Sequence, residues 1–531
     1  MLNLLLFSCA RVGAPNGGTR DSLAPKFLGS NIDTTRLNVS RTVKELRLDF
    51  DEYVMLKDFN KNFNVSPPIK KIKKVIPSNL ANKYVLIQWE DTLQANTTYN
   101  FNFGNAIVDN NESNPLPYFN FAFSTGDKID DLFVSGTVKD AMTLIKENQT
   151  AKDNKMVVGL YKAGENLDYK QKPDYITKVD EENYFELNFL PKGEFVIIAF
   201  DDENQNSVYD AGKEKVSFLK EKITLDSTSV RGLKLKLYPS KKVVKYKESK
   251  AINGGLLMTF EGNPETVEVK SLSEELKDFK VTHAKRSDSV NIWFDAEKSN
   301  LGGTVSKQLK LSYFTPTISD TISVSYKAVK EEFKLSNEAG NLIAPENNFV
   351  INTSLPIENL NTSSWKLESD SIAQDFTAKI SEKNPFKILV NSSFKPTKKY
   401  VLTIPKETVS SYYSSNDKSF QFQFEIDKPE NYGSFTAVIK NKPTAKFWVE
   451  LTNEKGEILY SQFTNASEVS FKNLKPATYI ARIRVDNNGN GFWDEADFAQ
   501  NIAAEDVYIF EKEINVRPLW EIKEDWELTN R

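Results

Sequence analysis

Apolar and polar residues alternate along much of this chain, in short runs separated by polar turns. The segments 45–50, 84–89 and 99–103 show the pattern, and in 119–123 the three phenylalanines fall on one face. A further run covers 290–294. Short alternating runs between turn-forming residues are typical of antiparallel sheets. The sequence therefore predicts an all-β chain of tandem β-sandwich domains.

Two segments far apart in the chain repeat one pattern of oxygen-bearing side chains. Each pattern follows an apolar run of strand length, 195–200 in the first copy and 479–483 in the second. The first Asp comes twelve residues after a leucine in both copies (202 − 190 and 486 − 474). We expect both sets to lie in the loop that closes the strand. The sets are Asp202, Asn204, Asn206 and Asp210, and Asp486, Asn488, Asn490 and Asp494.

These loops carry the chemistry of a calcium site. A hard cation prefers oxygen ligands, and alternate residues of a tight loop can direct carboxylate and amide oxygens to one point. If the first Asp is position 1, the side chains occupy positions 1, 3, 5 and 9, and the backbone carbonyl of Val208 or Phe492 at position 7 could complete the set. We therefore predict low-affinity structural Ca²⁺ at both loops.

The two copies are not equally suited to a cation. Gly491 stands at position 6, where calcium loops turn sharply, and Asp497 stands at position 12. The first copy has Ser207 and Lys213 at those places, so it is the poorer site. The alternative is that Asp, Asn and Gly simply form turns, which they favour without any metal.

A second repeat relates longer parts of the chain. The segment 93–99 has the same outline as 394–400, and from the tyrosine that ends each one the last strand of the unit lies 24 residues on (123 − 99 and 424 − 400). Each of these units precedes one that carries an Asp/Asn loop. The same two-domain order therefore occurs twice, with another β-rich stretch between the copies.

Composition removes most catalytic chemistry. The 531 residues include one cysteine, Cys9, and one histidine, His283, so no disulfide within the chain and no multi-His or multi-Cys zinc site can form. No GxSxG, phosphate-loop or dinucleotide-binding motif is found. We therefore predict a protein that is not an enzyme, although a pair of carboxylates for glycoside hydrolysis would leave no motif. The net charge of −4 offers no general attraction to nucleic acid.

The first nine residues end in an apolar stretch and Cys9, which resembles the end of a bacterial lipoprotein signal. The resemblance implies cleavage before Cys9 and lipid attachment to it. The stretch lacks the usual basic residues, so we expect the true start to lie upstream of Met1. A free thiol in a flexible tail is the alternative.

The first unit resembles the N-terminal immunoglobulin-like domain, first described in an S-layer protein, that is found in lipoproteins of the Bacteroidota. The loop-bearing units look like the transthyretin-like or carboxypeptidase-regulatory-like sandwich, although Ala477 replaces the usual glycine of the second lead-in. The residues that match the immunoglobulin-like domain are 15–18, Asp21, Pro25, 50–54, 66–68 and 123–126. The expected divisions are 1–23 (signal remnant and tether), 24–128 (immunoglobulin-like), 129–239 (transthyretin-like), 240–338 (β-sandwich), 339–428 (immunoglobulin-like) and 429–531 (transthyretin-like).

This resemblance implies a lipid-anchored outer-membrane protein that binds or scaffolds other envelope proteins, with a β-barrel assembly or export complex as a specific form of that role. The alternative is a carbohydrate-binding adhesin or carbohydrate-active enzyme, for which Trp293, Trp365, Trp493 and Trp520 are candidate stacking residues. The resemblance also implies O-glycosylation within the set Ser22, Thr34, Thr92, Ser227, Ser289, Thr321 and Ser371.

Overall fold

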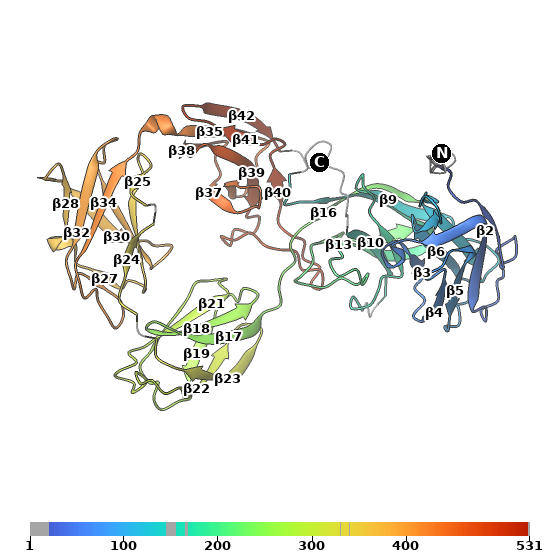
Figure 1. Ribbon diagram of the computed structural model, residues 1–531, viewed down its shortest axis with the longest axis horizontal. Coiled ribbons are helices and arrows are strands. Elements are labelled where there is room, and N and C mark those ends of the chain that lie inside the picture. Colours follow the sequence, from blue (N-terminus) through green and yellow to red (C-terminus); the bar gives the residue numbers. More distant parts are fainter. Residues whose placement is uncertain (1–20, 145–154, 165–167, 330, 339, 529–531) are drawn as a thin grey trace, which may run out of the picture. The chain divides into compact units, whose positions relative to one another are not determined.

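Strands make up nearly all of the regular structure, from the blue end of the ribbon to the red end (Figure 1). This is a computed structural model, and it describes residues 21–144, 155–164, 168–329, 331–338 and 340–528. The predicted all-β class, with tandem β-sandwich domains, is confirmed. The chain forms two compact units, one with the first two sandwiches and one with the remaining three.

The first sandwich combines a sheet of order β1-β2-β5-β4, in which β7 also pairs with β2, and a sheet of order β3-β6-β8. Alternation along β6 and β8 buries Phe101, Phe103, Phe121 and Phe123 between the sheets, as the pattern predicts. Its elements are β1 (Phe27–Ser30), β2 (Glu45–Leu56), α1 (Phe59–Asn62), β3 (Asn64–Ser66), β4 (Ile72–Ile76), β5 (Asn82–Trp89), β6 (Thr98–Gly104), β7 (Ile107–Asp109) and β8 (Phe119–Ser124).

The second sandwich has one sheet of order β11-β10-β13-β14, with β15 on β13, and one of order β12-β9-β16. The first Asp/Asn loop of the chain lies in this sandwich and follows β13 directly, as predicted. Its strands are β9 (Leu132–Asp140), β10 (Met156–Lys162), β11 (Tyr175–Lys178), β12 (Tyr184–Leu190), β13 (Gly193–Asp201), β14 (Val216–Phe218), β15 (Ile223–Leu225) and β16 (Val230–Leu237).

The third sandwich pairs its strands in the orders β17-β18-β21-β20 and β19-β22-β23. His283 ends strand β20, and its ring nitrogen Nε2 lies 3.0 Å from the carbonyl of Ser287, which is an ordinary role in a sheet. The strands are β17 (Lys245–Ile252), β18 (Gly255–Glu261), β19 (Glu268–Ser271), β20 (Lys280–His283), β21 (Ser289–Trp293), β22 (Lys307–Phe314) and β23 (Ser319–Tyr326).

The fourth sandwich has sheets of order β24-β26-β31-β30 and β25-β34-β32-β28-β29, and a small β27-β33 pair. The expected boundary at residue 338 is wrong, because β24 pairs with β26 and Phe333 and Leu335 lie in this core. Its elements are β24 (Leu335–Asn337), β25 (Leu342–Ile343), β26 (Phe349–Thr353), β27 (Asn359–Leu360), η1 (Thr362–Ser364), β28 (Lys366–Ser369), β29 (Ile372–Ala373), β30 (Phe376–Ile380), β31 (Lys387–Ser392), β32 (Lys399–Ile404), β33 (Val409–Ser410) and β34 (Phe420–Ile426).

The fifth sandwich repeats the strand order of the second. One sheet runs β37-β36-β39-β40, with β41 on β39, and the other runs β38-β35-β42. A long connection from β39 to β40 contains the second Asp/Asn loop. The elements are η2 (Pro429–Asn431), β35 (Gly433–Lys440), β36 (Phe447–Thr452), β37 (Ile458–Thr464), β38 (Glu468–Leu474), β39 (Ala477–Val485), β40 (Val507–Ile509), β41 (Ile514–Val516) and β42 (Glu521–Glu527).

Candidate metal-binding loops

In the second loop, the carboxylate of Asp486 is buried and is held by the backbone of its own loop. Its Oδ1 accepts the N–H of Asn490 and its Oδ2 the N–H of Gly491, both at 3.0 Å. Gly491 has a φ of 80°, a left-handed conformation that glycine adopts without steric cost. The side-chain amides of Asn488 and Asn490 donate to Oδ2 of Asp494 at 2.5 and 2.7 Å. The structure therefore brings the four predicted side chains together.

The first loop repeats this geometry. The carboxylate of Asp202 accepts the N–H groups of Asn206 and Ser207, both at 3.0 Å, and the amide of Asn204 donates to Oδ2 of Asp210 at 2.6 Å. Ser207 has a φ of 62° where the second copy has glycine. A residue with a Cβ pays a steric cost of roughly 1–2 kcal/mol there, so this turn is the more strained of the two.

The remaining predicted members of the set take different places. The N–H groups of Val208 and Phe492 at position 7 donate to Oδ1 of the asparagine two residues earlier, at 2.6 and 2.8 Å. Asp497 heads a separate turn, in which its Oδ1 accepts the N–H of Gln500 at 3.2 Å and its backbone pairs with Ile502. In this arrangement Asp497 does not act as the twelfth residue of a calcium loop.

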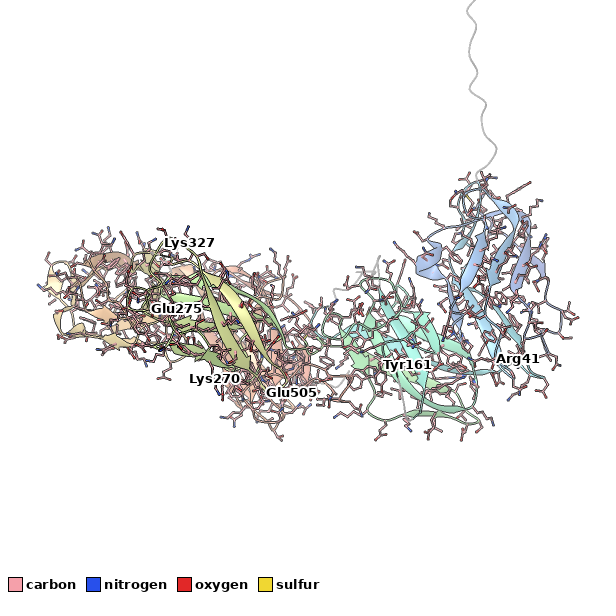
Figure 2. All side chains as sticks on the ribbon, turned by 90° about the horizontal axis from the view of Figure 1, so that it is seen from below. Arg41, Tyr161, Lys270, Glu275, Lys327 and Glu505 are labelled. Atoms are coloured by element: carbon pink, nitrogen blue, oxygen red, sulfur yellow. The ribbon has the colours of Figure 1, made fainter. Side chains whose placement is uncertain are left out.

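Glu505, labelled in Figure 2, accepts hydrogen bonds from the backbone of the second loop and was not identified from the sequence. Its Oε1 accepts the N–H of Asn488 at 3.2 Å and its Oε2 that of Asp494 at 2.9 Å, while its own carbonyl accepts the indole N–H of Trp493 at 3.1 Å. Burial raises the pKa of Glu505, against the lowering effect of these backbone hydrogen bonds. Its distance along the chain from the Asp/Asn set follows no known spacing rule.

A basic side chain of the third sandwich, Arg286, also contacts the second loop. Nη1 of Arg286 lies 2.7 Å from Oδ1 of Asp494, and its guanidinium lies 4.7 Å from the ring centre of Phe492. Burial alone would raise the pKa of Asp494, but hydrogen bonds from Asn488 and Asn490 and the charge of Arg286 hold that pKa below its usual value. Asp494 is therefore a carboxylate at ordinary pH.

Among the described residues, no group of three or more His, Cys, Asp or Glu side chains is placed to hold a metal ion. A cation in either loop would consequently depend on asparagine and backbone oxygens as well as the two carboxylates. That donor set suits a hard cation and does not suit zinc or copper.

The four candidate stacking tryptophans differ in environment. Trp293 and Trp365 are buried and belong to a hydrophobic core, Trp493 is half-buried, and Trp520 is 48% exposed with Arg517 over its ring. Two of the four are therefore ordinary core residues. The four tryptophans together do not form a flat exposed platform.

A different aromatic pair lies on the outer face of the fifth sandwich. The rings of Trp448 and Phe463 stack with centres 4.4 Å apart. Arg484 lies 5.8 Å from the ring centre of Trp448, and Lys446 lies 5.6 Å from that of Phe463. The two rings thus contact each other and neighbouring basic side chains, an arrangement that does not by itself indicate a sugar-stacking site.

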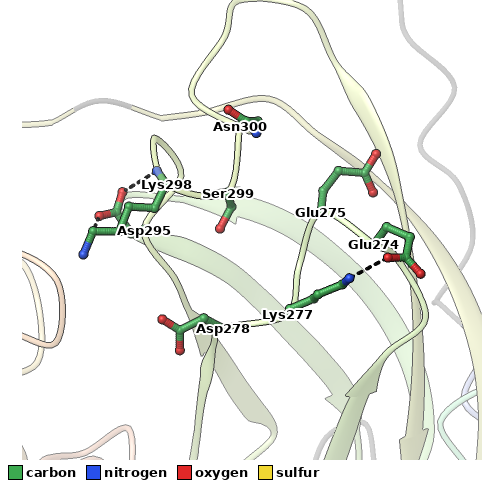
Figure 3. Close-up of a pocket in the computed structure, with 8 residues that line it drawn as sticks. All are labelled: Glu274, Glu275, Lys277, Asp278, Asp295, Lys298, Ser299 and Asn300. Atoms are coloured by element: carbon green, nitrogen blue, oxygen red, sulfur yellow. Dashed lines mark hydrogen bonds and ion pairs between the residues drawn. The ribbon is translucent and has the colours of Figure 1, made fainter.

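The third sandwich has a polar depression of about 420 Å³ (Figure 3). Lys277 pairs with Glu274 at 2.6 Å and Lys298 with Asp295 at 3.8 Å, and both lysines are largely exposed. Such pairs are characteristic of a solvated surface. The lining residues are Glu274, Glu275, Lys277, Asp278, Asp295, Lys298, Ser299 and Asn300.

Cys9 lies outside the described residues. No helix in the described part of the chain is long and apolar enough to cross a membrane.

The predicted glycosylation positions lie at the surface. Ser289 is half-buried, and the other six are exposed: Ser22, Thr34, Thr92, Ser227, Thr321 and Ser371.

Comparison with known proteins identifies the first sandwich. A model of the family described as "Bacterial Ig-like domain" matches residues 21–125, in agreement with the immunoglobulin-like resemblance. This match covers one domain of the chain. No curated protein matches the chain.

Several solved structures align with long parts of the chain at low identity. The S-layer protein rSbsC(31-844) is 12% identical over 93% of this chain and 67% of its own, with a TM-score of 0.15. SGBP-B of the Bacteroides ovatus mixed-linkage glucan utilization locus is 10% identical over 74% and 97%, with a TM-score of 0.20. The Bacillus cereus major pilin subunit BcpA is 11% identical over 75% and 99%, with a TM-score of 0.13. Scores this low carry no argument about function.

Proposed function

We propose that this protein is a non-enzymatic, lipid-anchored subunit of a bacterial outer membrane that binds or scaffolds other envelope proteins. The observation that carries the proposal is the domain composition of the chain. Its described residues build five β-sandwiches, each with its own hydrophobic core, and the first matches a bacterial immunoglobulin-like family. Tandem sandwiches suit a spacer or binding role, and partners within a β-barrel assembly or export complex are the specific form we favour.

Membrane fractionation tests the anchoring part of this proposal. Expressed from its native start, the protein should sediment with outer membranes, and Cys9→Ala should move it to the soluble fraction. Several acyl chains hold a protein firmly, whereas one gives only marginal binding. Ser8→Ala is the matched control and should leave the protein in the membrane fraction. Retention of Cys9→Ala at the wild-type level would refute lipid anchoring at this residue.

We also propose that the two Asp/Asn loops hold structural Ca²⁺. Asp486, Asn488, Asn490 and Asp494 already converge, and their counterparts in the first loop do the same. The amide nitrogens that face Asp494 exchange places with their oxygens by a half-turn of the side chain, which would direct oxygens toward a cation. With two formal charges per loop, the expected Kd is on the order of 10⁻⁴ to 10⁻³ M, as in extracellular modules.

A further inference from the structure

Strand β37 lies at the edge of its sheet in the fifth sandwich and exposes large apolar side chains. Ile458, Leu459 and Phe463 are 46%, 49% and 44% exposed. The strand reads Ile-Leu-Tyr-Ser-Gln-Phe-Thr and contains no charged residue and no proline. An edge strand of this kind presents unpaired backbone groups beside apolar surface, which favours pairing with another strand.

The equivalent edge in the second sandwich is covered. Register identifies β11 as the counterpart of β37, since Tyr175 lies opposite Leu160 and Tyr460 lies opposite Leu451 at matching places of the two sheets. Strand β11 packs beside β3 of the first sandwich, and the N–H of Ile176 donates to Oγ of Ser66 at 3.2 Å. Tyr175, Ile176 and Thr177 are all buried. In the first half of the chain, this edge therefore receives a strand of an immunoglobulin-like domain.

The fourth sandwich does not have a free strand with which to make the same contact. Strand β28 takes the place of β3, since each pairs with the strand that carries the repeated tyrosine, β32 with Tyr400 and β6 with Tyr99. Strand β29 pairs with the outer side of β28, through Glu368 opposite Ala373 and Ser369 opposite Ile372. The edge that would meet β37 is thus closed within its own domain.

Two other edge strands, β4 and β42, carry charged side chains, whereas β37 carries none and has only a bulge at Leu459. Strand β4 has exposed Lys73 and Lys74, and β42 contains several acidic residues and Lys523. Charged side chains on an edge oppose pairing with another sheet. Strand β37 has no such charge and exposes three large apolar side chains.

We propose that β37 pairs with β37 of a second copy of the chain, antiparallel and with Ser461 at the two-fold axis. This register sets Leu459 of each copy opposite Phe463 of the other; within the sheet Phe463 lies opposite Trp448, and Leu459 is the extra residue of a bulge. Tyr460 then lies opposite Gln462. Because the strand has no charge, self-pairing places no like charges opposite each other. One pair of edge strands makes a small interface, so the dimer should be weak and concentration-dependent.

Sedimentation velocity over a concentration series tests this pairing. We would use the full chain with Cys9→Ala, which removes both the lipid and any thiol cross-link. The protein should shift from monomer to dimer as concentration rises into the range of tens of micromolar, roughly the regime of weak interfaces. Leu459→Lys with Phe463→Lys should remain monomeric, because each substitution brings a charge to the edge.

Leu80→Lys with Val305→Lys is the matched control, since these residues are 81% and 77% exposed and lie outside β37. It should dimerise like the parent, and circular dichroism should show the same β content in all three proteins. Hydrogen exchange should slow at the amides of β37 as concentration rises. A parent that stays monomeric throughout, a double-lysine variant of β37 that still dimerises, or β37 amides that are protected only when another envelope protein is added would each overturn the proposal.

Discussion

Glu450 and Arg482 form an ion pair buried on the outer face of a sheet. Oε2 of Glu450 accepts from Nε and Nη2 of Arg482 at 2.9 and 2.7 Å, and the residues are 0% and 6% exposed. Arg484 completes a triad through Oε1, with its Nε at 3.0 Å. At the same register of the second sandwich, Gly159 lies opposite Ile198. The two halves of the chain thus share a fold but fill this face with different chemistry.

Removal of Glu450 should destabilise the fifth sandwich strongly. Glu450→Ala leaves the buried guanidinium of Arg482 and the half-buried guanidinium of Arg484 without their carboxylate, and loss of one partner of a buried ion pair typically costs about 3–5 kcal/mol. Hydrogen exchange in a urea series, read at the amides of β36 and β39, would measure the loss for this domain alone. Asp525→Ala removes the partner of Lys440 in an exposed pair and should change little. Equal effects of the two substitutions would contradict a special role for the buried triad.

Glu505→Ala should loosen the second loop. The substitution removes the acceptor for the N–H groups of Asn488 and Asp494, so the exchange of these two amides should accelerate. The first loop provides a control in the same molecule, because the amides of Asn204 and Asp210 should exchange as before. Unchanged protection at Asn488 and Asp494 would show that the loop keeps its form without Glu505.

Tyr432 should make the protein less stable in alkali. Burial, followed by the hydrogen bond to Asp427 at 3.0 Å, raises the pKa of Tyr432 from its ordinary value of 10.0 to about 12. Between these values the unfolded chain releases the phenolic proton and the folded chain keeps it, so stability falls as pH rises through this window. Urea unfolding from pH 9 to 12, roughly spanning the window, should be less pH-dependent in Tyr432→Phe. An identical pH dependence would contradict the shifted pKa.

Calcium should stabilise the full chain through the two loops. The gain follows the ratio of free calcium to Kd and is about 1.4 kcal/mol at a tenfold excess. Asp486→Ala with Asp494→Ala should abolish the larger part of the rise in melting temperature, and Asp202→Ala with Asp210→Ala the smaller part, because Ser207 strains the first turn. Identical melting curves with calcium and with chelator would mean that the loops are only hydrogen-bonded turns.

The repeats in the sequence correctly predicted the fold class and the residues that come together in each Asp/Asn loop. Alternation located the strands, since burial on one face imposes a period of two, as in Phe119, Phe121 and Phe123. The spacing of Asp486, Asn488, Asn490 and Asp494 is local, so it indicated a shared loop before the structure placed them together. Patterns of this kind can be read from a sequence because the residues that form them are close together in the chain.

Contacts between distant segments could not be predicted. Glu505 and Arg286 reach the second loop from other parts of the chain, and no spacing rule connects them to it. Glu450 resembles any exposed glutamate of an alternating strand, and only the structure reveals its burial beside Arg482. The boundary at residue 338 was missed because the short strand β24 has no strong pattern of its own.

Isolation of the protein from native membranes is the most direct measurement of its role as an envelope scaffold. The wild-type protein would be solubilised in mild detergent, separated by size and identified with its partners by mass spectrometry. We predict that it elutes with at least one other envelope protein in constant stoichiometry, and that membranes from a Cys9→Ala strain contain much less of the complex. Elution of the wild-type chain without any other protein, whether as a monomer or as a dimer of itself, would contradict the scaffold function.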